Sequence, residues 1–404
     1  MAKGECMSRR FRLVAAAAIL GLVAAACGGG DEPGPGAGGN EPKDCTWTIA
    51  TMGALSGDYA SVGQPIADGV EYAVNNANEE GNLACTLEFI SEDSQGDPNQ
   101  APSLAQKIVS NNTVVFCACP YFSGETLATG KIFGKAGVAI SGTGTNETID
   151  EQGFPTWFRA VAPDNIQAEV AAAYIKDGLG AKTVAVVHDN QDYSKGLAEG
   201  VKKNLGSIAQ GPFVINPEET DYSAVVAQVA EVDPDVVYYG GYTPQAGPLA
   251  KQLSDAGVDA TFMTDDGSKD PTFGDTAKDA AEGSLASCPC VDPLKVEGAA
   301  DYVTAMQDAY GKNAPGTFAA DMSDVTNIAI EALAQLNGDE SIEDVRKAVV
   351  DYFAAADGIQ GVAKAYAWND DGEFEGGPDD VWIYKWDTKA KNFLSLGAAS
   401  DLLK

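Results

Sequence analysis

Apolar and polar positions along the chain fall into two alternating patterns, which predict strands and helices in turn. Short runs rich in apolar and β-branched residues, such as Val114–Cys119 and Val236–Gly240, predict buried strands. Further strands are expected at Thr46–Met52, Thr86–Ile90, Val138–Ser141, Thr183–His188, Phe213–Ile215, Thr261–Thr264 and Val381–Trp386.

Segments with helical spacing separate these strands. Two helices are expected to begin at Asp97, as the N-cap before Pro98, and at Ser123, as the cap of the helix that follows it. Strands separated by such helices form βαβ units with parallel sheets. Because the series occurs twice, we predict an α/β fold of two doubly wound lobes. The other helices are expected at Pro65–Glu79, Asn165–Lys176, Tyr193–Leu205, Tyr222–Ala230, Thr243–Ala256, Glu297–Tyr310, Met322–Leu336 and Ile342–Tyr352.

The N-terminal segment has the pattern of an export signal. Basic residues precede an unbroken apolar run, Leu13–Ala26, which ends at Cys27. The run is shorter than the roughly 20 residues that a membrane-spanning helix needs. A lipoprotein signal would make Cys27 the lipidated first residue, and an ordinary secretory signal has a similar shape. Both interpretations exclude residues 1–26 from the fold. We expect a lipid-anchored protein on the extracytoplasmic face of the cell membrane, extracellular or periplasmic.

Length and composition indicate the number of domains after the N-terminal segment and the kinds of partner to expect. Residues 27–44 are rich in glycine and proline and predict a flexible linker. The rest of the 404 residues is long enough for two domains. A formal net charge of −33 repels the phosphates of nucleic acids, so we expect no nucleic acid partner.

Six cysteines follow the linker, and an even number in an exported chain favours disulfides. Cys45 and Cys85 each stand at the start of a predicted strand, so a bond between them would join neighbouring strands. Four thiolates could also hold zinc, but zinc motifs usually space them by about two to four residues, so disulfides are the expectation. The other four cysteines form two Cys-x-Cys pairs whose partners the sequence leaves open: Cys117, Cys119, Cys288 and Cys290.

Catalytic chemistry finds little support in the residues. His188 is the only histidine, and at a strand end it more often makes a structural hydrogen bond than a catalytic one. The chain contains neither the Gly-x-Ser-x-Gly of a nucleophile elbow nor the Gly-Lys-Ser/Thr of a phosphate loop. We therefore expect a protein that is not an enzyme and needs no cofactor or metal.

Polar side chains gather where the predicted strands end, which is where parallel sheets bind ligands. Ser123 follows one strand at a helix start, where free N–H groups favour an anion. The loop Ser141–Asn146 follows the next strand and offers hydroxyls and flexible glycines. Each segment alone could be an ordinary cap or turn, whereas the set indicates a ligand site. Three further strand ends carry His188–Gly196, Gly240–Gln245 and Asp265–Gly267.

Long ungapped stretches of the chain resemble a known family. The most specific are Val187–Tyr193, Val237–Tyr242 and Phe262–Gly267. Over about residues 47–386 the chain resembles the leucine/isoleucine/valine-binding branch of the type I periplasmic binding proteins, which serve ABC importers. The resemblance implies two Rossmann-like lobes joined by a three-strand hinge. Lobe 1 would comprise residues 45–162 plus 287–376, and lobe 2 residues 163–286 plus 377–404.

The resemblance also assigns a site. In the family an α-amino acid lies between the closing lobes. Its carboxylate would contact Ser123 and Thr145, and its ammonium would contact the loop at Thr143 and the carboxylate of Asp266. The tyrosines that match are Tyr193 and Tyr242. The positions that would surround the ligand side chain are Val62, Tyr121, Phe122, Gly144 and Phe318.

Several positions depart from the family pattern. Asp266 is one methylene shorter than the usual glutamate, and Tyr121 and Phe122 are bulkier than their counterparts. The disulfide that relatives place near the pocket is absent, because its positions fall at Gly96 and Phe122. Because of these departures, the resemblance supports an amino acid ligand more strongly than it supports Leu, Ile or Val as the particular side chain.

The resemblance implies a monomeric solute-binding lipoprotein of an ABC importer. It would capture a free amino acid, with Leu, Ile and Val as the first candidates, and deliver it to a membrane permease. The alternatives are a binding protein for another small amino acid or amide, or a ligand-sensing protein of the same fold.

Overall fold

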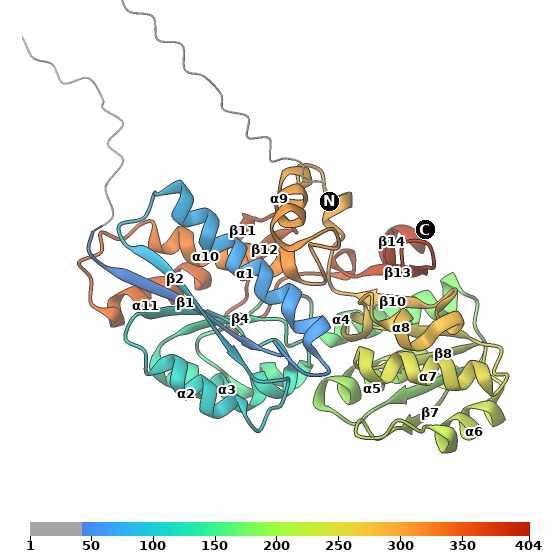
Figure 1. Ribbon diagram of the computed structural model, residues 1–404. Helices are drawn as coiled ribbons and strands as arrows, with labels where there is room; N and C mark the ends of the chain where they lie inside the picture. The colour runs from blue at the N-terminus through green and yellow to red at the C-terminus, as the bar shows by residue number, and fades with distance from the viewer. Residues whose placement is uncertain (1–42) are drawn as a thin grey trace, which may run out of the picture. The chain divides into compact units, whose positions relative to one another are not determined.

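The computed structural model describes residues 43–404, which belong to one compact unit of the chain and contain two large β-sheets flanked by helices (Figure 1). The expected export signal, Cys27 and nearly all of the expected linker lie outside the described residues. No helix between residues 43 and 404 has the length and apolar character needed to cross a membrane.

The first sheet has five parallel strands in the order β2-β1-β3-β4-β5. Figure 1 shows α2 and α3 on one face of this sheet and α1 and α10 on the other. Helix α11 also packs against β3, so the C-terminal part of the chain returns to the first sheet. The elements are β1 (Thr46–Gly53), α1 (Ala60–Glu80), β2 (Thr86–Asp93), α2 (Ala101–Val109), β3 (Val114–Ala118), α3 (Ser123–Ala136), β4 (Ala139–Gly142), β5 (Trp157–Arg159), α10 (Ala319–Leu333) and α11 (Ile342–Ala354).

The second sheet has seven strands in the order β14-β13-β10-β9-β8-β6-β7, and β13 and β14 run antiparallel to their neighbours. Its elements are α4 (Asp164–Ala173), β6 (Val184–His188), α5 (Asp192–Leu205), β7 (Ala209–Val214), α6 (Ser223–Val232), β8 (Val236–Gly240), α7 (Thr243–Asp255), β9 (Thr261–Thr264), α8 (Phe273–Ala277), β10 (Leu285–Cys288), β13 (Trp382–Asp387) and β14 (Asn392–Ala398). The remaining elements are α9 (Ala300–Tyr310), the hairpin β11 (Asp357–Gln360) and β12 (Ala365–Ala367), and α12 (Ala399–Leu402).

The central strands explain the strength of the sequence pattern. Every residue of β3, β6 and β8 is buried, because helices cover both faces of each sheet. Parallel strands of this kind are continuous apolar runs rather than alternating ones. The predicted α/β class with two doubly wound sheets is confirmed.

Several predicted helix starts are wrong. Helix α2 begins at Ala101, because Asp97 accepts a hydrogen bond from the Asn99 amide (2.9 Å) in a preceding turn. Helix α3 has Phe122 at its N-cap, and Ser123 is its first residue rather than its cap. The Ser123 hydroxyl oxygen instead accepts from the amide of Asn146 (3.1 Å).

Two helices of the C-terminal third also begin at other residues than predicted. Helix α9 begins at Ala300, three residues after the predicted start, and α10 begins at Ala319, three residues before it. The sequence pattern also missed β5, β10, β14 and the β11–β12 hairpin. Most of these strands are three or four residues long, which is too short for a periodic pattern to emerge.

The six described cysteines form three disulfides. Cys45–Cys85 links the residues that precede β1 and β2, with a Cα–Cα distance of 4.9 Å, as the strand positions led us to expect. The other bonds close within each Cys-x-Cys pair, Cys117–Cys119 and Cys288–Cys290. Among residues 43–404 no group of three or more potential metal ligands occurs.

Candidate functional site

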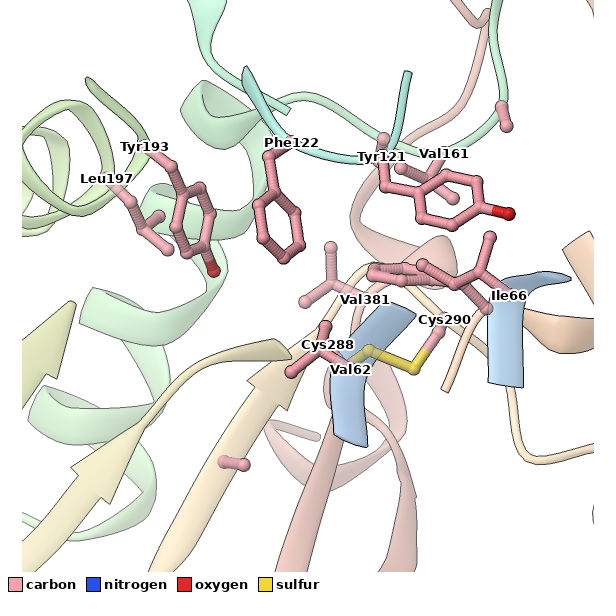
Figure 2. Close-up of a cluster of buried hydrophobic side chains, with 14 of the residues drawn as sticks. Val62, Ile66, Tyr121, Phe122, Val161, Tyr193, Leu197, Cys288, Cys290 and Val381 are labelled. Carbon is pink, nitrogen blue, oxygen red and sulfur yellow. A yellow bond between two sulfur atoms is a disulfide. The ribbon is translucent and has the colours of Figure 1, made fainter. Parts of the chain in front are cut away.

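A cavity of about 270 Å³ lies beyond the carboxyl ends of strands from both sheets. Elements of the first sheet contribute the loop after β3 and the loop after β4, and α1 and the start of α10 close one side. The second sheet contributes the segments after β6, β8 and β9. Figure 2 shows part of this region, with Phe122 near Tyr193 and Tyr121 near Ile66. The lining residues are Val62, Ile66, Tyr121, Phe122, Ser123, Thr143, Thr145, Tyr193, Tyr242, Asp266, Gly267 and Phe318.

The structure brings most of the expected site residues together. All six expected ligand contacts line this one cavity, as do four of the five positions expected around the ligand side chain. Gly144 does not line it. Its carbonyl oxygen instead accepts a hydrogen bond from the guanidinium of Arg159. Ile66 and Gly267 line the cavity without having been predicted.

One part of the cavity wall offers hydrogen-bond donors. Ser123 is the first residue of α3, and free N–H groups at a helix start attract negative charge. The Ser123 oxygen already accepts from the Asn146 amide, so its own hydroxyl proton can be donated. Thr143 donates its hydroxyl to the carbonyl of Tyr121 (2.8 Å), which fixes the loop that carries Thr145. This part of the wall is suited to a carboxylate.

Another part of the wall carries the carboxylate of Asp266. Its Oδ1 accepts hydrogen bonds from the Tyr193 hydroxyl (2.8 Å) and from Nε2 of Gln167 (2.7 Å). No hydrogen bond from the described residues reaches its Oδ2, which leaves this oxygen for a cationic group. Burial raises the pKa of Asp266 to about 6, so the group is mostly ionised at neutral pH. This part of the wall is suited to an ammonium.

Apolar side chains form the rest of the cavity wall. The hydroxyl of Tyr121 is hydrogen-bonded to Thr51 inside the first sheet, so it is not available to a ligand. The ring of Tyr121 lines the cavity together with Val62, Ile66 and Phe318. An aliphatic group is the natural occupant of such a surface.

Four aromatic rings form a cluster where the two halves of the molecule meet, one half built on the first sheet and the other on the second. Phe122 and Tyr59 belong to segments that follow strands of the first sheet, and Tyr193 and Tyr242 to segments that follow strands of the second. The centroid distances are 4.7 Å for Phe122–Tyr242, 5.3 Å for Tyr59–Tyr242, 5.9 Å for Tyr59–Phe122 and 5.1 Å for Tyr193–Tyr242. These distances are typical of favourable aromatic pairs.

Hydrogen bonds also join the two halves. Nδ2 of Asn146 donates to the carbonyl of Asp192 (2.6 Å). The Ser61 hydroxyl donates to Asp270 (3.0 Å). The cavity therefore lies in a closed arrangement, with contacts across both of its sides.

A buried arginine holds the loop that contains Thr143 and Thr145. The guanidinium of Arg159 is fully buried, and it donates to the carbonyls of Gly144 and Asn146. Its charge is paired with Glu373 and Asp150. Arg159 thus fixes the path of this loop from behind, without touching the cavity.

Two residues near the site had no clear sequence signal. Gln167 lies within α4, and nothing in its helical segment distinguishes it as the partner of Asp266. Tyr59 lies in the loop before α1. His188, by contrast, has the expected structural role: its buried Nδ1 accepts from the amide of Asn190 (2.9 Å), and burial lowers its pKa.

Comparisons with known proteins agree with this geometry. A family model described as "Periplasmic binding protein" matches residues 46–391. The Leu/Ile/Val-binding protein BraC3 of Rhizobium johnstonii is 31% identical over 325 residues, which cover 79% of this chain and 82% of that protein. The leucine-, isoleucine-, valine-, threonine- and alanine-binding protein of Pseudomonas aeruginosa is 33% identical over 249 residues, 60% of this chain and 66% of that protein.

Solved structures share the fold. A leucine-binding protein, LivK, from Thermotoga maritima superposes with a TM-score of 0.78 at 20% identity, over 86% of this chain and 97% of that one. The branched-chain amino acid transporter substrate-binding protein LivJ from Streptococcus pneumoniae, in complex with isoleucine, gives 0.76 at 22% identity, over 87% of this chain and all of the other. Proteins of this family bind solutes outside the cytoplasm and are not enzymes. The chain belongs to the periplasmic binding protein family.

Proposed function

We propose that this protein binds a free amino acid with an uncharged side chain between its two lobes and serves an ABC importer. The observation that carries the proposal is the polarity of the cavity, whose wall combines hydrogen-bond donors, a carboxylate and apolar side chains. A zwitterion with an aliphatic side chain matches all three regions.

The two charged groups of the ligand share its α-carbon and would be bound by neighbouring parts of the cavity wall. The ligand carboxylate would accept from the Ser123 hydroxyl and from free N–H groups at the start of α3, with Thr145 beside it. The ligand ammonium would pair with Oδ2 of Asp266 and the loop at Thr143. Charge-assisted hydrogen bonds of this kind contribute about 1.5–3 kcal/mol each.

The uncharged side-chain class follows from the cavity walls. No lysine or arginine lines the cavity within residues 43–404, and Asp266 is the one acidic residue that does. A ligand with an additional charge would therefore lack a partner inside the cavity. Leu, Ile and Val stay the first candidates, because the names of the relatives include them. Another small amino acid or amide is the alternative.

Binding of the ligand would favour closure of the two lobes. We place lobe 1 at residues 45–162 plus 287–376 and lobe 2 at residues 163–286 plus 377–404. The ligand contacts Ser123 on one lobe and Asp266 on the other, so it stabilises the closed state more than the open one. The aromatic pair Phe122–Tyr242 would separate on opening.

The N-terminal segment would keep the protein close to its membrane permease. Lipidation at Cys27 would anchor the protein at the membrane, and the linker would leave the monomeric body free to reach the permease. A ligand-sensing protein of the same fold would use the same cavity but would not require the permease.

The proposal is tested by isothermal titration calorimetry of purified residues 43–404 with each standard amino acid. We expect saturable binding of aliphatic amino acids and no binding of Asp, Glu, Lys or Arg. Ser123→Ala and Asp266→Asn should each weaken binding tenfold or more. Binding of no amino acid, or unchanged affinity in both variants, would contradict the proposed site.

A further inference from the structure

Phe122 occupies an unusual place in the cavity wall. Its ring lines the cavity, lies 4.7 Å from the ring of Tyr242 across the interface, and is only 7% exposed. Figure 2 draws this ring pointing into the region between Tyr193 and Tyr121. Phe122 is therefore both a wall of the ligand cavity and a contact between the two halves of the molecule.

The ring of Phe122 has no room to retreat from the ligand. Behind it lies Gly96, where an added β-carbon would be only 2.6 Å from Cε2 of Phe122. The backbone of Gly96 has a φ of +76°, a conformation that favours glycine. Tyr59 packs edge-on against the same ring, with 5.9 Å between centroids. Close packing on these sides fixes the ring in its present position.

The adjacent wall is equally fixed. The ring of Tyr121 packs so closely on Gly53 that an added β-carbon there would lie 1.8 Å from it. The hydroxyl of Tyr121 is tied to Thr51, and the side chain is almost fully buried. A ligand side chain therefore meets two rigid aromatic residues.

We infer that Phe122 is a specificity-determining residue that limits the ligand to a short uncharged side chain, such as that of alanine, serine, threonine or valine, in preference to leucine, isoleucine or phenylalanine. This inference rests on the proposed function and narrows its ligand class: of the first candidates named there, it keeps valine and disfavours leucine and isoleucine. A longer side chain must push Phe122 against Gly96 or away from Tyr242. The first movement causes a clash, and the second breaks the contact that closes the cavity.

The size of the effect follows from how apolar pockets discriminate. One methylene that fits or does not fit changes affinity by about 10- to 200-fold. We therefore expect the wild-type protein to bind its best short ligand at least tenfold more tightly than leucine. Removing part of the Phe122 ring should open space for the longer side chain and reverse or abolish this preference.

The experiment measures a ratio of affinities. Dissociation constants for alanine, valine and leucine are determined by calorimetry for the wild type, for Phe122→Leu and for Phe133→Leu. Phe133 is a fully buried phenylalanine of α3 that does not line the cavity, so it controls for a general loss of packing. The thermal unfolding midpoint of each variant shows whether it is folded.

The expected result is a tenfold or larger shift toward leucine in Phe122→Leu and an unchanged ratio in Phe133→Leu. Wild-type protein that binds leucine as tightly as alanine and valine would overturn the inference and leave the proposed function intact. The same holds for a ratio that Phe122→Leu does not change. Absence of binding for every amino acid would instead overturn the proposed function itself, and the inference with it.

Discussion

The hydroxyl of Tyr193 donates a 2.8 Å hydrogen bond to Oδ1 of Asp266, the oxygen that also accepts from Gln167. Tyr193 lies in the first turn of α5, and Asp266 follows β9, so the bond connects two strand ends of the second sheet. Both donors occupy the same oxygen. The carboxylate is therefore held in one orientation, with Oδ2 left for the proposed ammonium.

Tyr193→Phe tests this orientation. Removing the hydroxyl should weaken amino acid binding by up to about 1.5–3 kcal/mol, because Asp266 loses one of the two donors that orient it for the ligand. Tyr352→Phe is the matched control, since Tyr352 donates to the exposed Glu331 (2.9 Å) far from the cavity. Calorimetry should show a loss for the first variant and none for the second. Equal affinities would mean that Gln167 alone orients Asp266.

The pKa of Asp266 predicts how binding depends on pH. Burial raises this pKa to about 6, and only the ionised carboxylate attracts an ammonium. Affinity should therefore be nearly constant above pH 7 and fall up to tenfold per unit as the pH drops below 6. Titrations between pH 4.5 and 8 measure this. Asp266→Asn should bind weakly with a flat profile in the acidic range, and a flat profile in the wild type would argue against pairing with Asp266.

Asp164 predicts an effect on stability rather than binding. It is the first residue of α4 and is 2% exposed, and burial raises its pKa to about 8. Since this pKa lies above the unfolded value of about 4, the folded state binds an extra proton between these two values. Stability is therefore lost as the pH rises from about 4 to about 8.

Asp164→Asn should remove this loss. The free energy of unfolding should rise by as much as about 5 kcal/mol at pH 8 and change little at pH 4. Urea unfolding of wild type and variant at the two pH values gives the comparison. Asp192→Asn, on the largely exposed start of α5, is the control and should leave the difference small. A variant that is less stable at pH 8 would show that the charged form is needed.

Arg159 predicts a coupling between a buried ion pair and the ligand loop. Arg159→Met would leave Glu373 buried without its partner and release the carbonyls of Gly144 and Asn146. Breaking one side of a buried pair typically costs about 3–5 kcal/mol of stability. Arg159→Lys should keep the charge but lose part of the loop contacts. The loss in the free energy of ligand binding should therefore exceed the loss in the free energy of unfolding. Chemical unfolding and calorimetry separate the two effects, and parallel losses in both would indicate a purely structural role.

The sequence was sufficient to predict site residues that lie just after the carboxyl end of a strand. Ser123 and Asp266 closely follow apolar strands, so the parallel sheets alone bring them to one edge, and the family resemblance supplied their roles. The buried strands β3 and β8 were equally plain, because a short apolar run between turn residues is typical of a strand that is buried on both faces.

Features that depend on the tertiary path of the chain were not predicted. Gly144 was expected in the cavity, but the direction of its carbonyl is set by Arg159, which lies 15 residues further along the chain. Gln167 meets Asp266 across 99 residues, and no local pattern predicts that contact. The sequence also did not determine the disulfide partners of the four cysteines in the two Cys-x-Cys pairs, which the structure joins within each pair.

The Cys45–Cys85 disulfide has a mechanical consequence. It joins the amino ends of β1 and β2, whereas the cavity lies beyond the carboxyl ends, and the eight residues of β1 span about 26 Å at roughly 3.3 Å each. A pull on the chain at Lys43 is therefore carried by two covalently linked, fully paired strands before it can reach Gly53 and the ring of Tyr121. Tension from the N-terminal side is borne at one end of the sheet, and the walls of the cavity at the other end keep their spacing.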